Sequence, residues 1–412
     1  MPKNTDTLNG TPAQDGMRPR GSNQGGLRQF NERVVLQAIR LHGELPKAEI
    51  ARLTHLTPQT VQIITSRLEA DALVLKRAPV RGKIGQPSVP MALNPDGAYS
   101  IGIKIGRRSL DVLLLDFTAQ VRERLTLAYE FPDPDTLFDE IRARLKRLRR
   151  SLGPRRAQLL SGIGIAAPLS LGGWQSLLGV APEQAAKWND IDIRARVAAM
   201  TTLPVELVKD TAAACVAELV AGRGRSVRSF LYVFIDTFIG GGLVIDSHLR
   251  PGATGNAGAL GSMPLGLGGA DGAPPPQLLS VASLVTLEKM YAQAGLDARA
   301  VADARAVEAP WLPVTNEWMR QACPAIAMAI HGATALLELD GVIVDGSFSR
   351  DLLAQVLAQV GGALDRFSWE GIARPELLAG TIGADARAIG GAILPLYANF
   401  APDRDLFLKL DR

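Results

Sequence analysis

Cysteines and long apolar runs are scarce in this chain of 412 residues. The two cysteines, Cys215 and Cys323, are too few for a disulfide framework and favour reduced thiols. Both fall within helical patterns, so we expect them to be buried as small apolar side chains. The sequence has no run of 18 apolar residues and no signal-peptide core, which argues against a membrane partner and predicts a cytoplasmic protein.

Size and charge indicate several domains with different roles. Apolar residues make up 47% of the chain, and 412 residues are too many for one core, so we expect two or three domains. Residues 1–95 carry 13 Lys and Arg against 7 Asp and Glu, a net charge of +6. The whole chain carries +4, which leaves about −2 for the rest. The basic end is therefore the part suited to binding phosphate groups.

Residues 47–69 show the pattern of two short helices around a tight turn. Apolar residues recur there at helical spacing and can pack together: Ile50, Ala51, Leu53, Leu56, Val61, Ile64 and Leu68. Thr57 is a suitable N-cap, and Pro58 follows at the first helical position. His55 is a residue type that tolerates the positive φ of a turn. These features predict a helix-turn-helix with residues 57–70 as the recognition helix.

The flanking segments extend this motif to a winged helix-turn-helix. Residues 33–41 form an amphipathic pattern, and residues 73–93 are typical of two strands joined by a basic loop rich in Gly and Pro. A helical hairpin within a larger core is the alternative, and both flanks argue against it. Polar and basic residues at exposed positions are the predicted DNA contacts: Arg28, Gln59, Thr60, Gln62, Ser66, Arg67, Lys76, Arg77, Arg81, Lys83 and Gln86.

Composition and pattern predict the domain boundaries. Residues 1–26 are rich in Gly, Asn, Thr and Pro and are expected to form a disordered arm, followed by the winged-helix domain at 27–95. From residue 99 onward, two successive groups each begin with three strands and continue with helix–strand units. This order predicts an α/β fold of two related lobes with a cleft between them. The first lobe spans 96–212 and includes a C-terminal helix near 384–400; the second spans 213–383.

Several segments form a specific combination: Gly21-Ser-Asn-Gln-Gly-Gly-Leu-Arg28, Asn31-Glu-Arg33, Gly85-Gln-Pro-Ser88, and residues 162–169, 186–192, 208–218, 239–249 and 255–263. Together they resemble the ROK proteins, a family of repressors and sugar kinases, over about residues 21–397. The resemblance implies an N-terminal winged helix-turn-helix followed by a two-lobed, actin-like (ribonuclease H-like) ROK domain. It also implies that Asp210 occupies the place of the kinases' catalytic Asp.

Departures from the kinase pattern predict that this chain is not an enzyme. Lys104 stands where the resemblance implies an acidic residue near Mg–ATP, and an ammonium cannot ligate a hard cation. The second phosphate loop reads Asp236-Thr-Phe238 in place of Gly-Thr-Gly, which disfavours a nucleoside triphosphate. Ala259 and Ser262 replace a sugar-binding Glu and His, and the family's zinc cysteines are missing from residues 265–277. We therefore expect neither a metal nor a cofactor.

The family segments also supply candidate ligand contacts: Trp188, Asn189, Asp210, Ser262 and Gln277. Asp210 could bind a ligand hydroxyl without catalysis, and a capping role for the helix that follows is the alternative. Trp188 could offer its ring face to a sugar, with a place in the core as the alternative. Residues 240–242, three consecutive glycines, are a candidate hinge between the lobes.

Three functions are compatible with these features: a sugar-responsive transcription factor with a non-catalytic cleft, a bifunctional sugar kinase and regulator, and a DNA-binding protein whose body serves only oligomerisation. Lys104 argues against the second, and Asp210 with Trp188 argues against the third. We favour a repressor of carbohydrate metabolism. Its expected partners are a duplex DNA operator and a small neutral carbohydrate or polyol, and we expect a homodimer or homotetramer.

Overall fold

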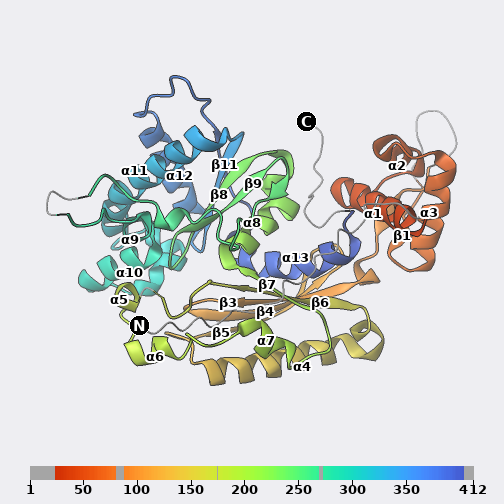
Figure 1. The fold of residues 1–412 in the computed structure, drawn as a ribbon, viewed down its shortest axis with the longest axis horizontal. Coiled ribbons are helices and arrows are strands. Elements are labelled where there is room, and N and C mark those ends of the chain that lie inside the picture. Colours follow the sequence, from red (N-terminus) through yellow and green to blue (C-terminus); the bar gives the residue numbers. More distant parts are fainter. Residues whose placement is uncertain (1–23, 80–87, 174, 269–271, 403–412) are drawn as a thin grey trace, which may run out of the picture.

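A small helical domain stands beside two lobes, each built on a five-stranded sheet (Figure 1). The computed structural model describes residues 24–79, 88–173, 175–268 and 272–402. The predicted arm at 1–26 therefore lies almost wholly outside the described residues, as do Arg81, Lys83 and Gln86 of the wing.

The N-terminal domain contains the predicted helices and wing strands. They are α1 (Gln24–His42), α2 (Lys47–Thr54), α3 (Pro58–Ala70) and the antiparallel pair β1 (Val74–Lys76) and β2 (Met91–Leu93). His55 ends α2 in the left-handed region with φ 54°, as its position in the turn predicted. The Thr57 hydroxyl accepts a hydrogen bond from the Thr60 N–H, and Pro58 is the first residue of α3. The predictions for this turn and cap are confirmed.

The first lobe is the lower one in Figure 1, and its sheet has the order β5-β4-β3-β6-β7. The strands are β3 (Tyr99–Ile105), β4 (Ser109–Asp116), β5 (Val121–Ala128), β6 (Leu160–Ala167) and β7 (Val205–Lys209). β3, β6 and β7 run parallel, and β4 and β5 join as antiparallel neighbours. Helices α4 (Pro134–Ala157), α6 (Pro182–Ala186) and α7 (Ile193–Ala198) lie on its outer side, while α5 (Gln175–Leu178) lies beside the second lobe.

The second lobe repeats this strand order as β10-β9-β8-β11-β12. Its strands are β8 (Phe230–Ile235), β9 (Gly240–Ile245), β10 (His248–Leu249), β11 (Gly341–Gly346) and β12 (Glu376–Ala379). Its helices are α9 (Leu278–Ala282), α10 (Leu284–Gln293), α11 (Leu312–Leu337) and α12 (Arg350–Leu364). Each sheet thus starts with a three-stranded meander and ends with parallel strands, as predicted for two related lobes. The exact division of the lobes at residue 212 stays a prediction.

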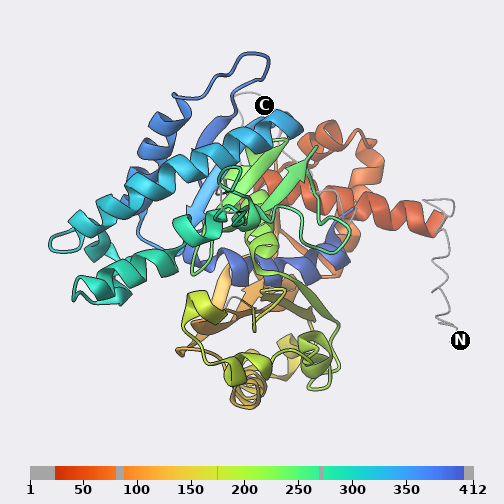
Figure 2. The same cartoon turned by 60° about the vertical axis from the view of Figure 1, so that its left-hand side comes forward.

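Two helices lie between the sheets: α8 (Asp210–Ala221) and α13 (Ala386–Phe400). Figures 1 and 2 both show α13, in blue, running along the sheet of the first lobe. The approach is so close that a Cβ on Gly164 of β6 would lie 1.9 Å from the Gly391 carbonyl oxygen. A Cβ on Gly390 would lie 1.7 Å from the Ala213 carbonyl oxygen of α8. Glycine is needed at both crossings because backbone meets backbone there.

The winged-helix domain packs on the end of α13. Arg40 of α1 places its guanidinium carbon 4.9 Å from the ring centre of Phe117 and 5.4 Å from that of Tyr397. Phe117 also meets Phe400 edge to face, with 4.8 Å between ring centres. The side chain of Arg225 donates to the carbonyl of Leu41 at the end of α1. These contacts join the winged-helix domain to both lobes, and burial lowers the pKa of Arg40.

Candidate functional site

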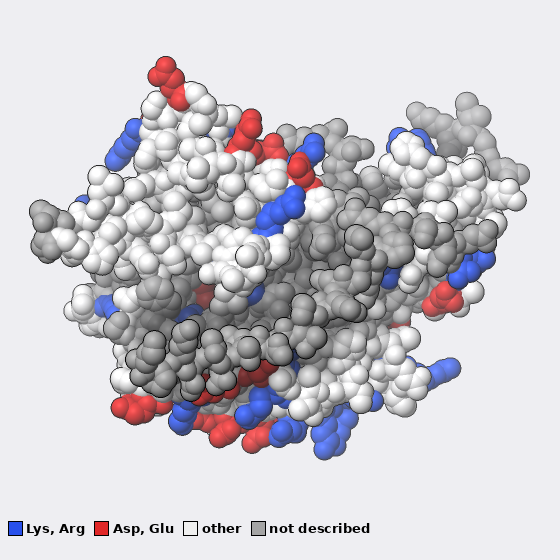
Figure 3. Space-filling model, in the orientation of Figure 1, with Lys and Arg blue, Asp and Glu red and all other residues white. Residues whose placement is uncertain are grey.

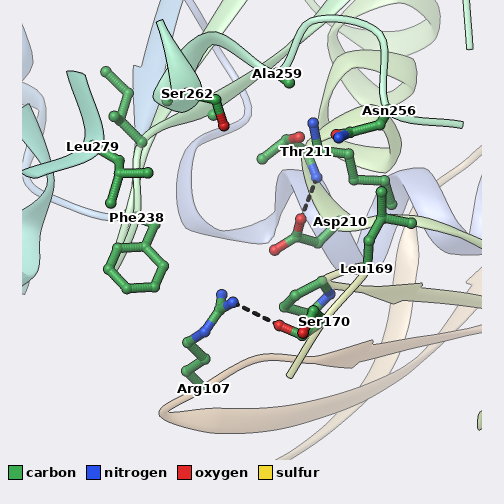
Figure 4. Close-up of a pocket in the computed structure, with 15 residues that line it drawn as sticks. Arg107, Leu169, Ser170, Asp210, Thr211, Phe238, Asn256, Ala259, Ser262 and Leu279 are labelled. Carbon is green, nitrogen blue, oxygen red and sulfur yellow. Dashed lines mark hydrogen bonds between the residues drawn. The ribbon is translucent and has the colours of Figure 1, made fainter. Parts of the chain in front are cut away.

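A cavity of about 260 Å³ opens between the lobes (Figure 4). Its lining comes from the loop after β3, the segment after β6, the start of α8, the loop before β9 and residues before α9: Arg107, Pro168, Leu169, Ser170, Lys209, Asp210, Thr211, Phe238, Ile239, Gly240, Asn256, Ala259, Gly261, Ser262 and Leu279. Asp210 and Ser262 are the two predicted ligand contacts in this lining. The cavity therefore unites residues that lie 52 positions apart in the sequence.

Asp210 is held at the carboxyl end of β7, where it begins α8. Its Oδ1 accepts a hydrogen bond of 2.8 Å from the Thr211 N–H, while the N-cap position belongs to Lys209. Its Oδ2 lies 3.9 Å from Nη1 of Arg387, at the start of α13. Asp210 thus accepts a hydrogen bond from a free N–H of the first turn, but it does so as the first residue of the helix and not as the N-cap. The capping alternative is modified to that extent. Its other oxygen is aimed at the region between the lobes.

A second cavity of about 350 Å³ adjoins the first and is rich in charge. Lys104 lines it and is only 6% exposed; its Nζ donates to Ser109 Oγ at 2.5 Å and to Asp111 Oδ2 at 3.1 Å. Burial lowers the pKa of Lys104, and the neighbouring Arg387 adds to this effect. The ammonium thus fills the place where the resemblance implied an acid. A hard cation gains no ligand from it.

Arg387 and Asp236 form the buried ion pair of this second cavity. Their side chains are 6% and 16% exposed. Burial alone would raise the pKa of Asp236, but the charges of Arg387 and Lys104 outweigh it and lower the value. Burial would likewise lower the pKa of Arg387, and Asp236 with Asp210 reverses that direction. Asp236 is therefore engaged by a cation of the protein itself.

Two arginines of the β3–β4 loop reach across to the second lobe. The Arg107 guanidinium carbon lies 4.7 Å from the Phe238 ring centre, and its Nη2 donates to the Ser170 carbonyl at 2.9 Å. Arg108 forms an ion pair of 3.1 Å with Glu288 of α10. Figure 4 shows Arg107 and Phe238 facing each other at the edge of the cavity. These contacts connect the lobes directly beside Asp210.

The remaining predicted ligand contacts lie outside the cavity lining. Trp188 is 6% exposed and packs in the core of the first lobe. Its indole N–H donates to the Pro132 carbonyl at 2.9 Å. The structure therefore agrees with the alternative in which Trp188 is a core residue. Asn189 is exposed beside it. Gln277 precedes α9 and pairs with Pro264. The sequence did not identify Asn256 and Ser170 as lining residues, because polar residues in loops carry no periodic signal. It left two alternatives for Arg107, attraction of an anion or a charged strand end, and favoured the second.

The three glycines of the candidate hinge, residues 240–242, belong to β9, and their role as a hinge stays a prediction. A Cβ on Gly242 would lie 2.5 Å from the Cys215 Cβ, and one on Gly240 would lie 2.8 Å from the Thr211 side chain. Their small size lets β9 pack against α8. Cys215 and Cys323 are both buried in helices, as expected.

Most of the predicted DNA contacts that the structure describes are exposed. The exposed side chains of the winged-helix domain among them are Arg28, Gln59, Gln62, Ser66, Arg67, Lys76 and Arg77, with Thr60 half-buried. Among the described residues, the cations of α3, β1 and the start of the β1–β2 connection have acidic neighbours: Arg67 pairs with Glu32 at 3.6 Å, Lys76 with Glu69 at 2.8 Å and Arg77 with Glu44 at 2.9 Å. Figure 3 shows basic and acidic side chains side by side at this end.

The polar face of α3 is organised by hydrogen bonds. Lys47 donates to the Gln62 side-chain oxygen at 2.8 Å, and Gln62 donates to the Ser66 hydroxyl at 3.3 Å. Gln59 is exposed one turn earlier. Glutamine side chains on a recognition helix can pair with adenine edges in the major groove. The spacing places both amides on the outward face.

Metal and membrane features were searched within the described residues. No group of three or more His, Cys, Asp or Glu side chains is arranged there to hold a metal ion. No helix in that part of the chain is long and apolar enough to cross a membrane.

The fold and the cleft define a two-lobed α/β protein of the kinase-like type with an added winged helix. Residues 100–397 match the model of the ROK family, and the chain belongs to that family. It is similar to the xylose repressor of Bacillus subtilis (strain 168), with 25% identity over 252 residues that make up 60% of this chain and 64% of that repressor. The chain thus matches less than two thirds of that curated relative's length.

Solved structures share the fold at low identity. A ROK family transcriptional regulator, a homologue of the Escherichia coli MLC protein, superposes with a TM-score of 0.65 and 20% identity, covering 91% of this chain and 97% of that one. The ROK family glucokinase of Streptomyces griseus, solved with glucose and AMPPNP, gives a TM-score of 0.57 and 19% identity, covering 72% and 99%. The regulator match extends over the winged-helix part as well as the lobes.

Proposed function

We propose that the protein is a DNA-binding transcriptional regulator of carbohydrate metabolism, acting as a repressor, whose kinase-like cleft senses a carbohydrate. The observation that carries this proposal is a winged helix packed on a two-lobed body whose phosphate site is occupied by the protein's own charges. The repressor names of its sequence relatives support the same class. The proposal includes a dimer or tetramer that spaces two winged helices over a two-fold operator.

The chemistry of the cleft supports sensing without catalysis. A phosphoryl-transfer site needs Mg²⁺ ligands and a path for the triphosphate. Here Lys104 pairs with Asp111, and Asp236 pairs with Arg387, so the carboxylates near the phosphate position are already engaged. The Arg107 guanidinium stacks on the Phe238 ring. A glycine at this position of a phosphate loop would leave room for the phosphates. A bifunctional kinase and regulator is the second candidate, and Asp210 at the head of α8 is the feature that favours it.

DNA binding should depend steeply on salt. Exposed ion pairs contribute little to stability, so Lys76 and Arg77 can exchange their glutamates for phosphates at small cost. Changing either residue to Gln should lower the slope of log affinity against log salt by about 0.9, as measured by fluorescence anisotropy with an operator selected from random DNA. Arg142→Gln, on the distant helix α4, is the matched control and should leave the slope unchanged. If the Lys76→Gln, Arg77→Gln and Arg142→Gln proteins all bound DNA independently of salt, the assigned interface would be refuted.

The proposed sensor gives a second expected result. Asp210→Asn should weaken a sugar's effect on operator affinity, because a carboxylate accepts stronger hydrogen bonds from sugar hydroxyls than an amide does. Ligand-free operator binding should stay nearly intact, since the winged helix does not contact Asp210. Asp139→Asn, on the exposed face of α4, serves as the control. An unchanged response in Asp210→Asn would favour a purely oligomerising body, and ATP-dependent sugar turnover lost in the same variant would favour the bifunctional kinase.

α13 provides a physical route between cleft and winged helix. Its first turn holds Arg387, which pairs with Asp236 and faces Asp210. Its last turns hold Tyr397 and Phe400, which contact Arg40 and Phe117. A ligand that binds Asp210 changes the surroundings of Arg387 and so biases the position of this helix. Such coupling can shift operator affinity only by the ligand's differential affinity for two states, about 1–3 kcal/mol in typical cases.

A further inference from the structure

Arg107 differs from the other cations around the two cavities. Four of them pair with carboxylates: Lys104 with Asp111, Arg108 with Glu288, Arg124 with Asp385 and Arg387 with Asp236. Within the described residues, no carboxylate lies within ion-pairing distance of the Arg107 guanidinium. Its one hydrogen bond is to a neutral acceptor, the carbonyl of Ser170. Arg107 is thus a partly buried cation whose charge is not compensated by direct contact.

The position of Arg107 makes its charge available to a ligand. It is the one charged residue that lines both cavities, so its guanidinium lies at their junction. The Phe238 ring supports one face, which fixes the plane of the guanidinium. Its Nε is buried and has no partner among the described residues. Figure 4 shows the end of the side chain pointing toward the space in front of Asp210.

The electrostatic balance of the lining has a positive sign. The two cavities together are lined by six Lys and Arg (Lys104, Arg107, Arg108, Arg124, Lys209 and Arg387) and four carboxylates (Asp111, Asp210, Asp236 and Asp385). Glu288, outside the lining, pairs with Arg108, which leaves an excess of one cation. Burial lowers the pKa of Arg107 and of Lys209, and it outweighs the opposing charges of Asp210 and Asp236 at Arg107 and of Asp210 at Lys209. A desolvated cation without a carboxylate gains more from an anionic partner than a hydrated one does.

We propose that the effector is an anionic carbohydrate whose carboxylate or phosphate oxygens bind the Arg107 guanidinium, while its hydroxyls reach Asp210 and Ser262. This inference rests on the proposed sensor function and replaces the expectation of a neutral sugar. Carboxylate and phosphate share the planar, multi-oxygen chemistry that a guanidinium recognises. The Asp210 carboxylate would repel an anion placed beside it, so the anionic group lies at Arg107 and the hydroxyl-bearing part lies at Asp210.

The test compares matched ligands on the full-length protein. Isothermal titration would be run with aldoses, their uronates and their terminal phosphates, including glucose, glucuronate and glucose 6-phosphate, at constant ionic strength. An anionic member of a set should bind at least about 10-fold tighter than its neutral parent, as a charge-assisted hydrogen bond provides. The uronate and phosphate arms distinguish the two sources of charge. Inorganic phosphate alone should also raise the melting temperature.

Substitution of Arg107 is the decisive part of the experiment. Arg107→Gln should reduce binding of the anionic ligand by about 10- to 100-fold and abolish the inorganic phosphate effect. Arg142→Gln is the matched control, because Arg142 lies on α4 outside both cavities and its exposed charge is paired with Asp139, and it should change binding by less than about fivefold. A neutral sugar that binds as tightly as its anionic partners would overturn the inference and leave the sensor function standing. So would the absence of any Arg107-dependent binding by sugars or phosphate.

Discussion

Gly390→Ala is expected to destabilise the protein by about 3 kcal/mol or more. The added methyl group would lie 1.7 Å from the Ala213 carbonyl oxygen, a backbone atom that cannot turn aside. Relief requires α13 and α8 to separate, and both helices belong to the core that joins the lobes. Urea unfolding, followed by circular dichroism, measures the change through the midpoint of the transition.

Gly362→Ala in α12 provides the matched control for this substitution. A Cβ at Gly362 meets nothing within 4 Å, so alanine should gain about 0.5–1 kcal/mol from its higher helix propensity. The two substitutions add the same atom to a helical glycine and should move stability in opposite directions. Equal stability of Gly390→Ala and the wild type would contradict the close crossing of α13 and α8.

Arg387→Met is expected to cost about 3–5 kcal/mol, because it leaves Asp236 buried without its cation. The folded pKa of Asp236 lies below its ordinary value, so the stabilisation is present above the usual Asp range and is lost as pH falls through the lowered pKa. The measurement therefore belongs at neutral pH. Arg142→Met, which breaks an exposed pair with Asp139, should cost less than about 1 kcal/mol.

A double-mutant cycle separates the ion pair from other effects of losing Arg387. Asp236→Asn combined with Arg387→Met removes both charges and should recover much of the loss, because an unpaired buried charge is what makes the single change costly. The cycle is read from urea midpoints at pH 7. Strictly additive effects would mean that the two side chains do not interact in solution, and the account of the second cavity would then fail.

Elements with a regular pattern could be predicted from the sequence. The apolar spacing around Ile50 and Leu68 predicted α2 and α3, because burial imposes a period on such segments. The C-terminal helix near 384–400 exists as α13, but it packs against strands of both lobes, so its assignment to the first lobe stays a prediction. Short elements such as β10, with two residues, are too brief to produce a periodic signal.

The site was less predictable than the fold, for a physical reason. Asp210 and Ser262 could be located because family segments surround them. The partner of Asp236 could not, since Arg387 is 151 positions away and its identity as a partner depends on how α13 crosses the lobes. The stacking of Arg107 on Phe238 likewise joins two loops from different lobes. Pairings of this kind are made by tertiary packing and leave no local trace.

The packing of Arg40 between the rings of Phe117 and Tyr397 affects how an operator would be recognised. A DNA-binding domain on a flexible linker can adapt to half-sites at many separations, whereas one that packs rigidly on the rest of the protein cannot. In any assembly of several copies, the contact surfaces between lobes would then set the distance and angle between the winged-helix domains. Those surfaces lie far from any base pair. Substitutions at those surfaces could retarget the protein to operators with a different gap while the bases it recognises stay the same.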